Sequence, residues 1–254
     1  MLLVTNKLTK AFGGLVAVSA VDINIQQGEL VGLIGPNGAG KTTVFNLLTG
    51  LTPVTSGKVV FEGRNLVGLK AYQVTALGIA RTFQNIRLFK ELTVLDNIKI
   101  ACHLHAKYGL AGGLTHLGRY AQEEKDIEAK ALKVLSVFKL EGRKDEIAGS
   151  LPYGAQRRLE IARALATEPK LLLLDEPAAG MNPQETSELM KTIAWLRHEF
   201  KLTILLIEHD MRLVMGVCER IYVLDYGQLI AEGTPAEIRS NRRVVEAYLG
   251  EEVS

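Results

Sequence analysis

Short apolar runs alternate with helical stretches along much of the chain. Three uninterrupted apolar runs have the length of buried strands, and they cover residues 29–35, 171–175 and 203–208. The first run leads directly into residues 41–48, where the pattern predicts a helix that is stopped by Gly50. This alternation is typical of an α/β layer structure.

Weaker strand signals extend the same pattern toward both ends of the chain. Residues 58–62 alternate like a strand and are followed by a turn, and residues 80–83 are also strand-like. Near the C-terminal end, residues 220–225 and 228–232 form a predicted strand pair around a tight turn.

The middle of the chain follows a different pattern. From residue 93 to about residue 148 the strand signals vanish, and residues 108–118 contain four glycines, which is typical of a loop. Beyond this loop, apolar positions share one helical face with charges opposite, namely Ile127, Ala131, Val134, Leu135 and Phe138. We therefore expect one domain over residues 1–254, in which a helical lobe at 93–148 is inserted between core segments 1–92 and 149–254.

Composition and charge narrow the class of protein. Of the 254 residues 47% are apolar, which provides for a sizeable core, and a net charge of +2 is too small to indicate nucleic-acid binding. No apolar run approaches the roughly 18 residues that span a bilayer, and the N-terminal segment lacks a signal-peptide pattern. Cys102 and Cys218 match no metal or redox spacing, so we expect reduced, buried thiols. These features predict a cytoplasmic chain that does not cross a membrane by itself.

The strongest chemical motif is GPNGAGKT at residues 35–42, between a predicted strand and a predicted helix. It fits the pattern G-x-x-x-x-G-K-[ST], in which glycines let the backbone wrap around phosphates. In such a loop Lys41 reaches the β- and γ-phosphates, and Thr42 supplies a hydroxyl to Mg²⁺. The alternative is an ordinary glycine turn, which the strand–loop–helix context disfavours.

Two adjacent carboxylates end the apolar run LLLLDEP at residues 171–177. Asp175 is a candidate ligand of Mg²⁺, directly or through water. Glu176 is a candidate general base that polarises the attacking water. Taken alone, the pair would be a solvated strand end, but beside a phosphate-binding loop it predicts phosphoryl chemistry.

Two further polar residues follow strand-like segments. His209 ends the run at 203–208, where it is either a structural hydrogen-bonding residue or a contact to the γ-phosphate. Gln84 ends the run at 80–83, just before the helical lobe. From that position it could reach both the metal and the lobe.

A second helix start is marked by SLPYGAQRR at residues 150–158. Exposed N–H groups and the helix dipole make such an end a site for an anion. This helix start lies more than a hundred residues beyond Lys41 in the sequence. Pro152 stands at a position where a hydroxyl side chain would have helped to bind the anion.

In this order, these motifs resemble those of the ATP-binding subunit of an ABC (ATP-binding cassette) transporter, over essentially the whole chain. The resemblance implies a P-loop NTPase core, with a mixed sheet flanked by helices, an inserted α-helical subdomain and an N-terminal antiparallel β region. It also implies that the chain binds ATP and Mg²⁺ and hydrolyses ATP to ADP and phosphate.

The resemblance assigns a role to each motif. Residues 35–43 correspond to the Walker A loop, residues 171–176 to Walker B and residues 178–182 to the D-loop. Gln84 corresponds to the Q-loop glutamine, which contacts the metal, and His209 to the switch histidine. The Walker A residues expected at the nucleotide are Gly35, Asn37, Gly38, Ala39, Gly40, Lys41, Thr42 and Thr43.

The adenine contact is assigned in the same way. Phe12 occupies the place of the aromatic residue that stacks on adenine, and Val18 lies beside the base or the ribose. The alternative for Phe12 is packing in the core.

The segment LPYGAQ at residues 151–156 corresponds to the family's signature motif, which is usually LSGGQ. That motif binds the ATP held by the opposite subunit of a head-to-tail dimer, so the expected anion is another chain's γ-phosphate. Pro152 stands in the place of the serine and Tyr153 in that of the first glycine, whereas Gly154 is retained. The serine hydroxyl is lost, and the helix dipole with the Gly154 N–H remains.

A closer resemblance concerns the branched-chain amino acid importer class. It rests on the runs FGGLVAV, RTFQNIRLF, DEPAAGMNP and IEHDM and on the ending EAYLGE. It implies a multi-subunit importer with a second ATPase subunit (a copy or a homologue), integral membrane permease subunits and a periplasmic or extracellular solute-binding protein. The chain would lie at the cytoplasmic face of the inner membrane. Urea and lipopolysaccharide transporters share parts of the pattern and remain alternatives, as does a soluble ABC protein without a membrane partner.

Overall fold

The computed structural model describes residues 1–106 and 120–249. The glycine-rich loop predicted at 108–118 lies outside the described residues. Contacts divide the chain into two compact units, each described by itself below. The first unit comprises Met1–Arg81, Lys170–Ala178 and Met190–Ser254, and the second comprises Thr82–Pro169 and Ala179–Leu189.

The predicted insert at 93–148 falls within the second unit, which is larger than the insert. This division follows contacts alone, so the boundaries of an inserted lobe stay a prediction.

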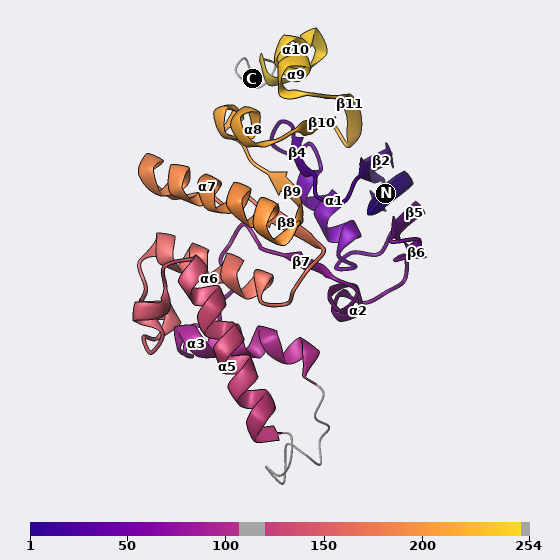
Figure 1. Ribbon diagram of the computed structural model, residues 1–254. Coiled ribbons are helices and arrows are strands. Elements are labelled where there is room, and N and C mark those ends of the chain that lie inside the picture. The colour runs from indigo at the N-terminus through magenta and orange to yellow at the C-terminus, as the bar shows by residue number, and fades with distance from the viewer. Residues whose placement is uncertain (107–119, 250–254) are drawn as a thin grey trace. The chain divides into compact units, whose positions relative to one another are not determined.

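A six-stranded sheet with the order β11-β10-β4-β9-β8-β7 forms the centre of the first unit (Figure 1). Its strands are β4 (Leu30–Ile34), β7 (Ile79–Arg81), β8 (Leu171–Asp175), β9 (Thr203–Ile207), β10 (Arg220–Asp225) and β11 (Gln228–Gly233). Neighbouring strands are parallel except for β10 and β11, which form the predicted hairpin. Every residue of β4, β8 and β9 is buried, which explains the three uninterrupted apolar runs of the sequence.

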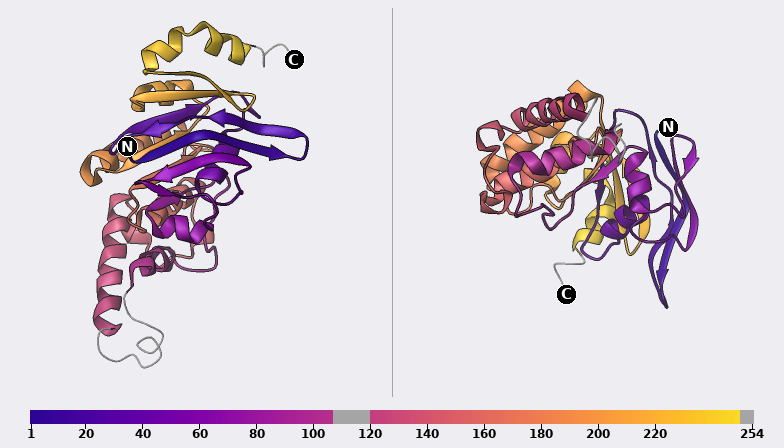
Figure 2. Two further views of the ribbon diagram at one scale, coloured as in Figure 1. Left: turned by 90° about the vertical axis from the view of Figure 1, so that its right-hand side faces the viewer. Right: turned by 90° about the horizontal axis from the view of Figure 1, so that it is seen from below.

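An antiparallel sheet forms the N-terminal part of the first unit. Its strands are β1 (Leu3–Phe12), β2 (Leu15–Val21), β3 (Asn24–Ile25), β5 (Ser56–Phe61) and β6 (Arg64–Asn65). The left view of Figure 2 shows β1 between β2 and β5, with which it pairs. This sheet confirms the antiparallel β region that the family resemblance implies.

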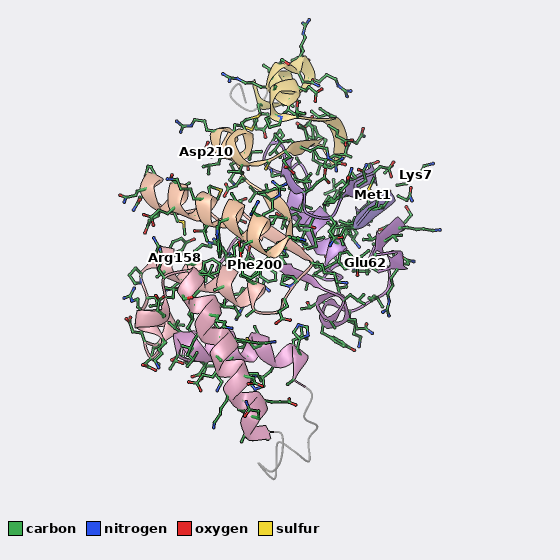
Figure 3. The ribbon with its side chains drawn as sticks, viewed as in Figure 1. Met1, Lys7, Glu62, Arg158, Phe200 and Asp210 are labelled. Atoms are coloured by element: carbon green, nitrogen blue, oxygen red, sulfur yellow. The ribbon has the colours of Figure 1, made fainter. Side chains whose placement is uncertain are left out.

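The helices of the first unit pack on these sheets. They are α1 (Lys41–Leu48), α2 (Ala71–Ala76), α8 (Met211–Val217), α9 (Pro235–Ser240) and α10 (Arg242–Leu249), while α7 (Pro183–Phe200) has residues in both units. One buried cluster joins Phe61 of the antiparallel sheet, Leu173 of the central sheet and Phe45 of α1. Asp210, labelled in Figure 3, caps α8 because its side chain accepts a hydrogen bond of 2.8 Å from the Arg212 N–H.

The second unit is built on helices. They are α3 (Val94–Cys102), α5 (Tyr120–Val137) and α6 (Tyr153–Leu165), with the short 3₁₀ turns η1 (His103–His105), η2 (Glu141–Arg143) and η3 (Ala148–Ser150). On the predicted apolar face of α5 and the residues after it, all positions are buried except the half-buried Val134. Cys102 and Cys218 are both buried, free thiols, as predicted, and burial raises the pKa of Cys218 to about 12.

The turn between β10 and β11 fixes the loop that precedes α1. Gly227 in this turn has a φ of 76°, its N–H donates to the Ala39 carbonyl at 3.0 Å, and its carbonyl accepts from the Ser19 N–H at 2.8 Å. A Cβ at Gly227 would lie 2.6 Å from the Ala17 carbonyl oxygen. The turn is therefore clasped between β2 and the loop, and only a glycine fits there.

We predict that Gly227→Ala destabilises the fold much more than Gly28→Ala. Both glycines have positive φ, but a Cβ at Gly28 would meet nothing within 4 Å. Gly28→Ala should therefore cost only the left-handed strain, about 1–2 kcal/mol, whereas Gly227→Ala should cost about 2–5 kcal/mol. The measurement is the free energy of unfolding in urea, and equal losses for the two variants would show that the clasp is unimportant.

Candidate functional site

The loop between β4 and α1 is shaped by glycines. Gly35, Gly38 and Gly40 have φ values of 148°, 76° and 98°. A Cβ at Gly35 would lie 1.9 Å from the Leu224 carbonyl oxygen, so this backbone approach requires glycine. A Cβ at Gly38 would meet nothing within 4 Å, so this part of the loop borders open space where a ligand can approach the backbone.

The first turn of α1 is suited to an anion. Helix α1 starts at Lys41 after Gly40, and among the described residues of its first turn none is acidic. The ammonium of Lys41 donates to the carbonyls of Gly35 at 2.6 Å and Pro36 at 2.7 Å. A cation is thus held inside the loop at the positive end of the helix dipole, the arrangement that phosphate-binding loops use.

A cavity of about 500 Å³ borders the same loop. Its lining residues are Pro36–Ala39, Asp225, Tyr226, Ile230, Arg243, Glu246 and Ala247. Asn37, Gly38 and Ala39, which the sequence places at the nucleotide, line this cavity, whereas Lys41 and Phe12 do not.

Asp175, at the end of β8, is buried and paired with Arg81 at the end of β7. The Nη2 of Arg81 lies 2.8 Å from Oδ2 of Asp175, and its Nη1 donates to the side chain of Asn46 in α1 at 2.6 Å. The guanidinium also lies 5.3 Å from the centre of the Phe45 ring. Arg81 therefore ties the carboxylate to the helix that follows the glycine loop. The sequence analysis missed it, although an arginine ending a strand-like run beside an acidic strand end is a usable signal.

Glu176 and His209 meet in the first unit. The Nε2 of His209 lies 2.6 Å from Oε1 of Glu176. Glu176 is buried and has a φ of 48°, and its N–H donates to the Ile207 carbonyl at 2.9 Å. Positive φ in a glutamate is strained backbone, and such strain concentrates where a side chain must point in one direction. Two of the three residues predicted as catalytic are thus brought together.

Glu208, which the sequence analysis also missed, is buried next to this pair. Its Oε1 accepts from the Ala178 N–H at 2.9 Å, and its Oε2 accepts from the His209 N–H at 3.3 Å. Burial raises the pKa of the Glu208 carboxyl group above its ordinary value. This side chain joins the backbone after β8 to the backbone after β9. The signal in the sequence was a carboxylate directly before His209.

The oxygen ligands in the first unit suit Mg²⁺. Thr42 offers a hydroxyl and Asp175 a carboxylate, which are hard ligands of the kind that Mg²⁺ prefers. Across residues 1–106 and 120–249 no group of three or more His, Cys, Asp or Glu residues forms a metal cage. Gln84 belongs to the second unit, so its contact with the metal stays a prediction.

Phe12 and Val18 differ in exposure. Phe12, at the end of β1, is 50% exposed, and the Lys10 ammonium lies 4.7 Å from the centre of its ring. Its ring is therefore not core packing and can stack on a base. Val18 is fully buried in the hydrophobic core, so its burial does not favour the predicted side-chain contact with the base or ribose.

The predicted signature segment forms the start of α6 in the second unit. Pro152 is the N-cap residue, and its carbonyl accepts from the N–H groups of Ala155 at 2.9 Å and Gln156 at 3.0 Å. The side chain of Gln156 donates to the Leu151 carbonyl at 2.8 Å. The helix start is thus formed without a side-chain cap, and no acidic residue lies in its described first turn.

Two contacts explain the residues beside Pro152. A Cβ at Gly180 would lie 2.9 Å from the Tyr153 ring, so Tyr153 packs on the backbone of the predicted D-loop. A Cβ at Gly154 would lie 2.7 Å from Oε1 of Glu185, so this carboxylate lies beside the N-terminal end of α6. The bulky residue in the signature segment is accommodated by a glycine from another segment of the same unit.

The geometry above is that of a nucleotide-binding cassette. Within residues 1–106 and 120–249 no helix is long and apolar enough to span a membrane. A family model described as ABC transporter matches residues 18–179. The chain belongs to the ABC transporter family. A second model, described as branched-chain amino acid ATP-binding cassette transporter, matches residues 228–254.

Individual relatives agree with this family. LivG of Salmonella typhimurium, a high-affinity branched-chain amino acid transport ATP-binding protein, is 49% identical, covering 98% of each chain. A crystal structure of the ADP conformation of an ABC transporter cassette has a TM-score of 0.84 at 34% identity, covering 98% of each chain. A dimeric cassette bound to ADP and Pi has a TM-score of 0.78 at 26% identity, covering 92% of this chain and 98% of that one. The predicted fold class and the ABC ATPase activity are thereby confirmed.

We predict that Arg81→Met lowers the free energy of unfolding by about 3–5 kcal/mol, because Asp175 loses its buried partner. Arg81→Lys should lose less. Adding Mg²⁺ with ATP should restore more stability to Arg81→Met than ATP with EDTA, since a divalent cation returns positive charge beside Asp175. The control is Arg242→Met, which removes the exposed pair with Glu246 and should cost under about 1 kcal/mol. Thermal unfolding measures all three, and similar costs for Arg81 and Arg242 would contradict the role of the buried pair.

The raised pKa of Glu208 predicts a pH dependence of stability. The native carboxyl group holds its proton more tightly than the unfolded one, so stability falls as the pH rises above the unfolded pKa toward the folded one. Between about pH 4 and pH 7 the wild type should therefore lose stability relative to Glu208→Gln. Glu237 gives the matched control, because hydrogen bonds from Thr234 lower its pKa. As the pH rises to the unfolded glutamate pKa of about 4.3, the wild type should gain stability relative to Glu237→Gln and then stay level, and a fall above about pH 4 for both variants would refute the assignment.

Proposed function

We propose that this ABC ATPase powers a multi-subunit importer of branched-chain or other hydrophobic amino acids. The observation that carries the hydrolytic part is the 2.6 Å contact between Glu176 and His209, beside a glycine loop that holds the Lys41 ammonium. The amino-acid part is supported by the likeness to LivG and by the match of the C-terminal model. Urea and lipopolysaccharide transport remain alternatives that no contact in this structure favours.

The proposed chemistry follows from the positions of these side chains. Lys41 neutralises the β- and γ-phosphates, and Phe12 stacks on the adenine ring. Thr42 and Asp175 would hold Mg²⁺, which clamps the phosphate oxygens when bound. Glu176 accepts the proton of the attacking water, and His209 fixes the direction of the Glu176 carboxylate. The family resemblance assigns Gln84 to the metal as well.

The proposed partners follow from the signature segment and the family. Pro152, Tyr153 and Gly154 face the ATP of a second ATPase subunit, a copy or a homologue, in a head-to-tail dimer. Closing and reopening of this dimer drives integral membrane permease subunits, which receive solute from a periplasmic or extracellular binding protein. The chain then works at the cytoplasmic face of the inner membrane. We propose no role with nucleic acid.

The central test is Glu176→Gln. The variant should bind ATP with unchanged affinity and accumulate as an ATP-bound dimer, while MgATP turnover falls by at least about 100-fold, since only the base is lost. Size-exclusion chromatography and phosphate release measure the two effects. Glu199→Gln, an exposed glutamate of α7, is the control and should hydrolyse like the wild type. Turnover at the wild-type rate in Glu176→Gln would exclude Glu176 as the base.

The transported substrate is tested by measuring uptake in cells. Cells that lack their own LivG and receive this chain should regain uptake of labelled leucine, whereas Glu176→Gln should not restore it. Uptake of labelled urea in the same cells is the comparison. If the chain restored uptake of urea but not of leucine, urea transport would replace the proposed amino-acid import.

A further inference from the structure

Helix α6 carries a fully buried ion pair that the proposed function does not use. Nη1 of Arg157 lies 2.8 Å from Oε2 of Glu160, and the two side chains are 0% and 2% exposed. Both residues belong to the second unit. Charged side chains are rarely buried this completely, because desolvation costs several kcal/mol per ion.

The pair holds the backbone around Gln84 from both sides. Arg157 donates from Nη1 to the Phe83 carbonyl and from Nη2 to the Gln84 carbonyl, each at 2.6 Å. Glu160 Oε1 accepts from the Arg87 N–H at 3.0 Å and from the Phe83 N–H at 3.4 Å. Two carbonyls and two amides of residues 83–87 are thus satisfied by side chains one turn apart on one helix.

The same helix begins with the predicted signature residues. Nη2 of Arg157 lies 3.3 Å from the Tyr153 hydroxyl, one turn nearer the start of α6. Apolar residues of similar volume commonly match or exceed the stability of a buried ion pair. Stability alone therefore does not explain the pair, whereas a rigid link between two segments does, because bidentate guanidinium contacts fix geometry.

We propose that Arg157 and Glu160 are positioning residues that lock residues 83–87 to the first two turns of α6. This Arg157–Glu160 clamp makes Gln84 and the segment Pro152–Gly154 change position together when nucleotide binds. Without the clamp, Gln84 and this segment would move independently of each other. The inference rests on the proposed roles of Gln84 and of the signature segment.

The test uses the full chain with Arg157→Met and Glu160→Met together, which removes both charges and leaves no buried ion behind. Amide hydrogen exchange of residues 83–87 should become faster. The kcat for MgATP should fall about tenfold or more, because Gln84 is misplaced, while the Kd for ATP of the isolated subunit stays within about twofold, because Lys41 and Phe12 are untouched. Unchanged exchange and kcat would overturn the proposal.

A mutant cycle separates positioning from general damage. If the clamp acts through Gln84, adding both methionines to Gln84→Ala should lower kcat by less than about twofold beyond Gln84→Ala alone. If the separate effects of Gln84→Ala and of the two methionines on kcat multiplied in the combined variant, the proposal would be overturned. Arg163→Met is the matched control, because this α6 arginine binds the Arg87 carbonyl but neither Phe83 nor Gln84, and it should keep kcat within about twofold.

A second variant covers the case in which the double methionine variant does not fold. Arg157→Lys keeps the charge opposite Glu160 but cannot reach both carbonyls with a planar fork. It should show faster exchange at residues 83–87 and about a threefold lower kcat, and wild-type values for both would overturn the proposal. If the wild-type chain did not hydrolyse MgATP, the proposed function would be refuted. The hydrogen-exchange measurement would still test the clamp.

Discussion

The parallel register of the central sheet is the constraint on which the site depends. Strands β4, β8 and β9 run side by side, with Leu33 and Asp175 both paired with Ile207. Their carboxyl ends therefore meet at one edge, which places the glycine loop, the Asp175–Glu176 pair and His209 together. This is the edge at which α/β sheets generally bind ligands, because loops and helix starts supply exposed N–H groups there.

Three buried carboxylates end or follow the central strands, and each has a different partner. Asp175 is held by Arg81, Glu176 contacts His209, and Glu208 relies on backbone N–H groups and pays for burial with a raised pKa. Mutual repulsion and desolvation both favour a bound cation at such a place. Carboxylates beside a bound nucleotide would therefore favour a divalent cation between them and the phosphates.

Local patterns in the sequence predict the features that depend on neighbouring residues. The buried strands, α1 and the glycine loop are of this kind, since apolar runs, glycines and the lysine lie within one short segment. Arg81 and Glu208 escaped because their partners, Asp175 and Ala178, are distant in sequence and no local period marks them. Burial of Val18 was equally hidden, since a family position carried over to this chain gives no information on burial, and its place beside the base or ribose stays a prediction.

The signature segment shows how a departure from a family motif can be tolerated. Replacing a glycine by Tyr153 brings a large ring to the start of α6, and Gly180 makes room for it by having no side chain. The Tyr153 hydroxyl also lies within 3.3 Å of Arg157, so the ring is held at both ends. Pro152 is the N-cap residue of α6 and offers no side-chain hydrogen bond there. In the proposed role of this segment, a γ-phosphate would meet backbone groups whose placement depends on α6. The Arg157–Glu160 pair links α6 to residues 83–87. The loss of one side-chain contact makes the placement of that helix matter more.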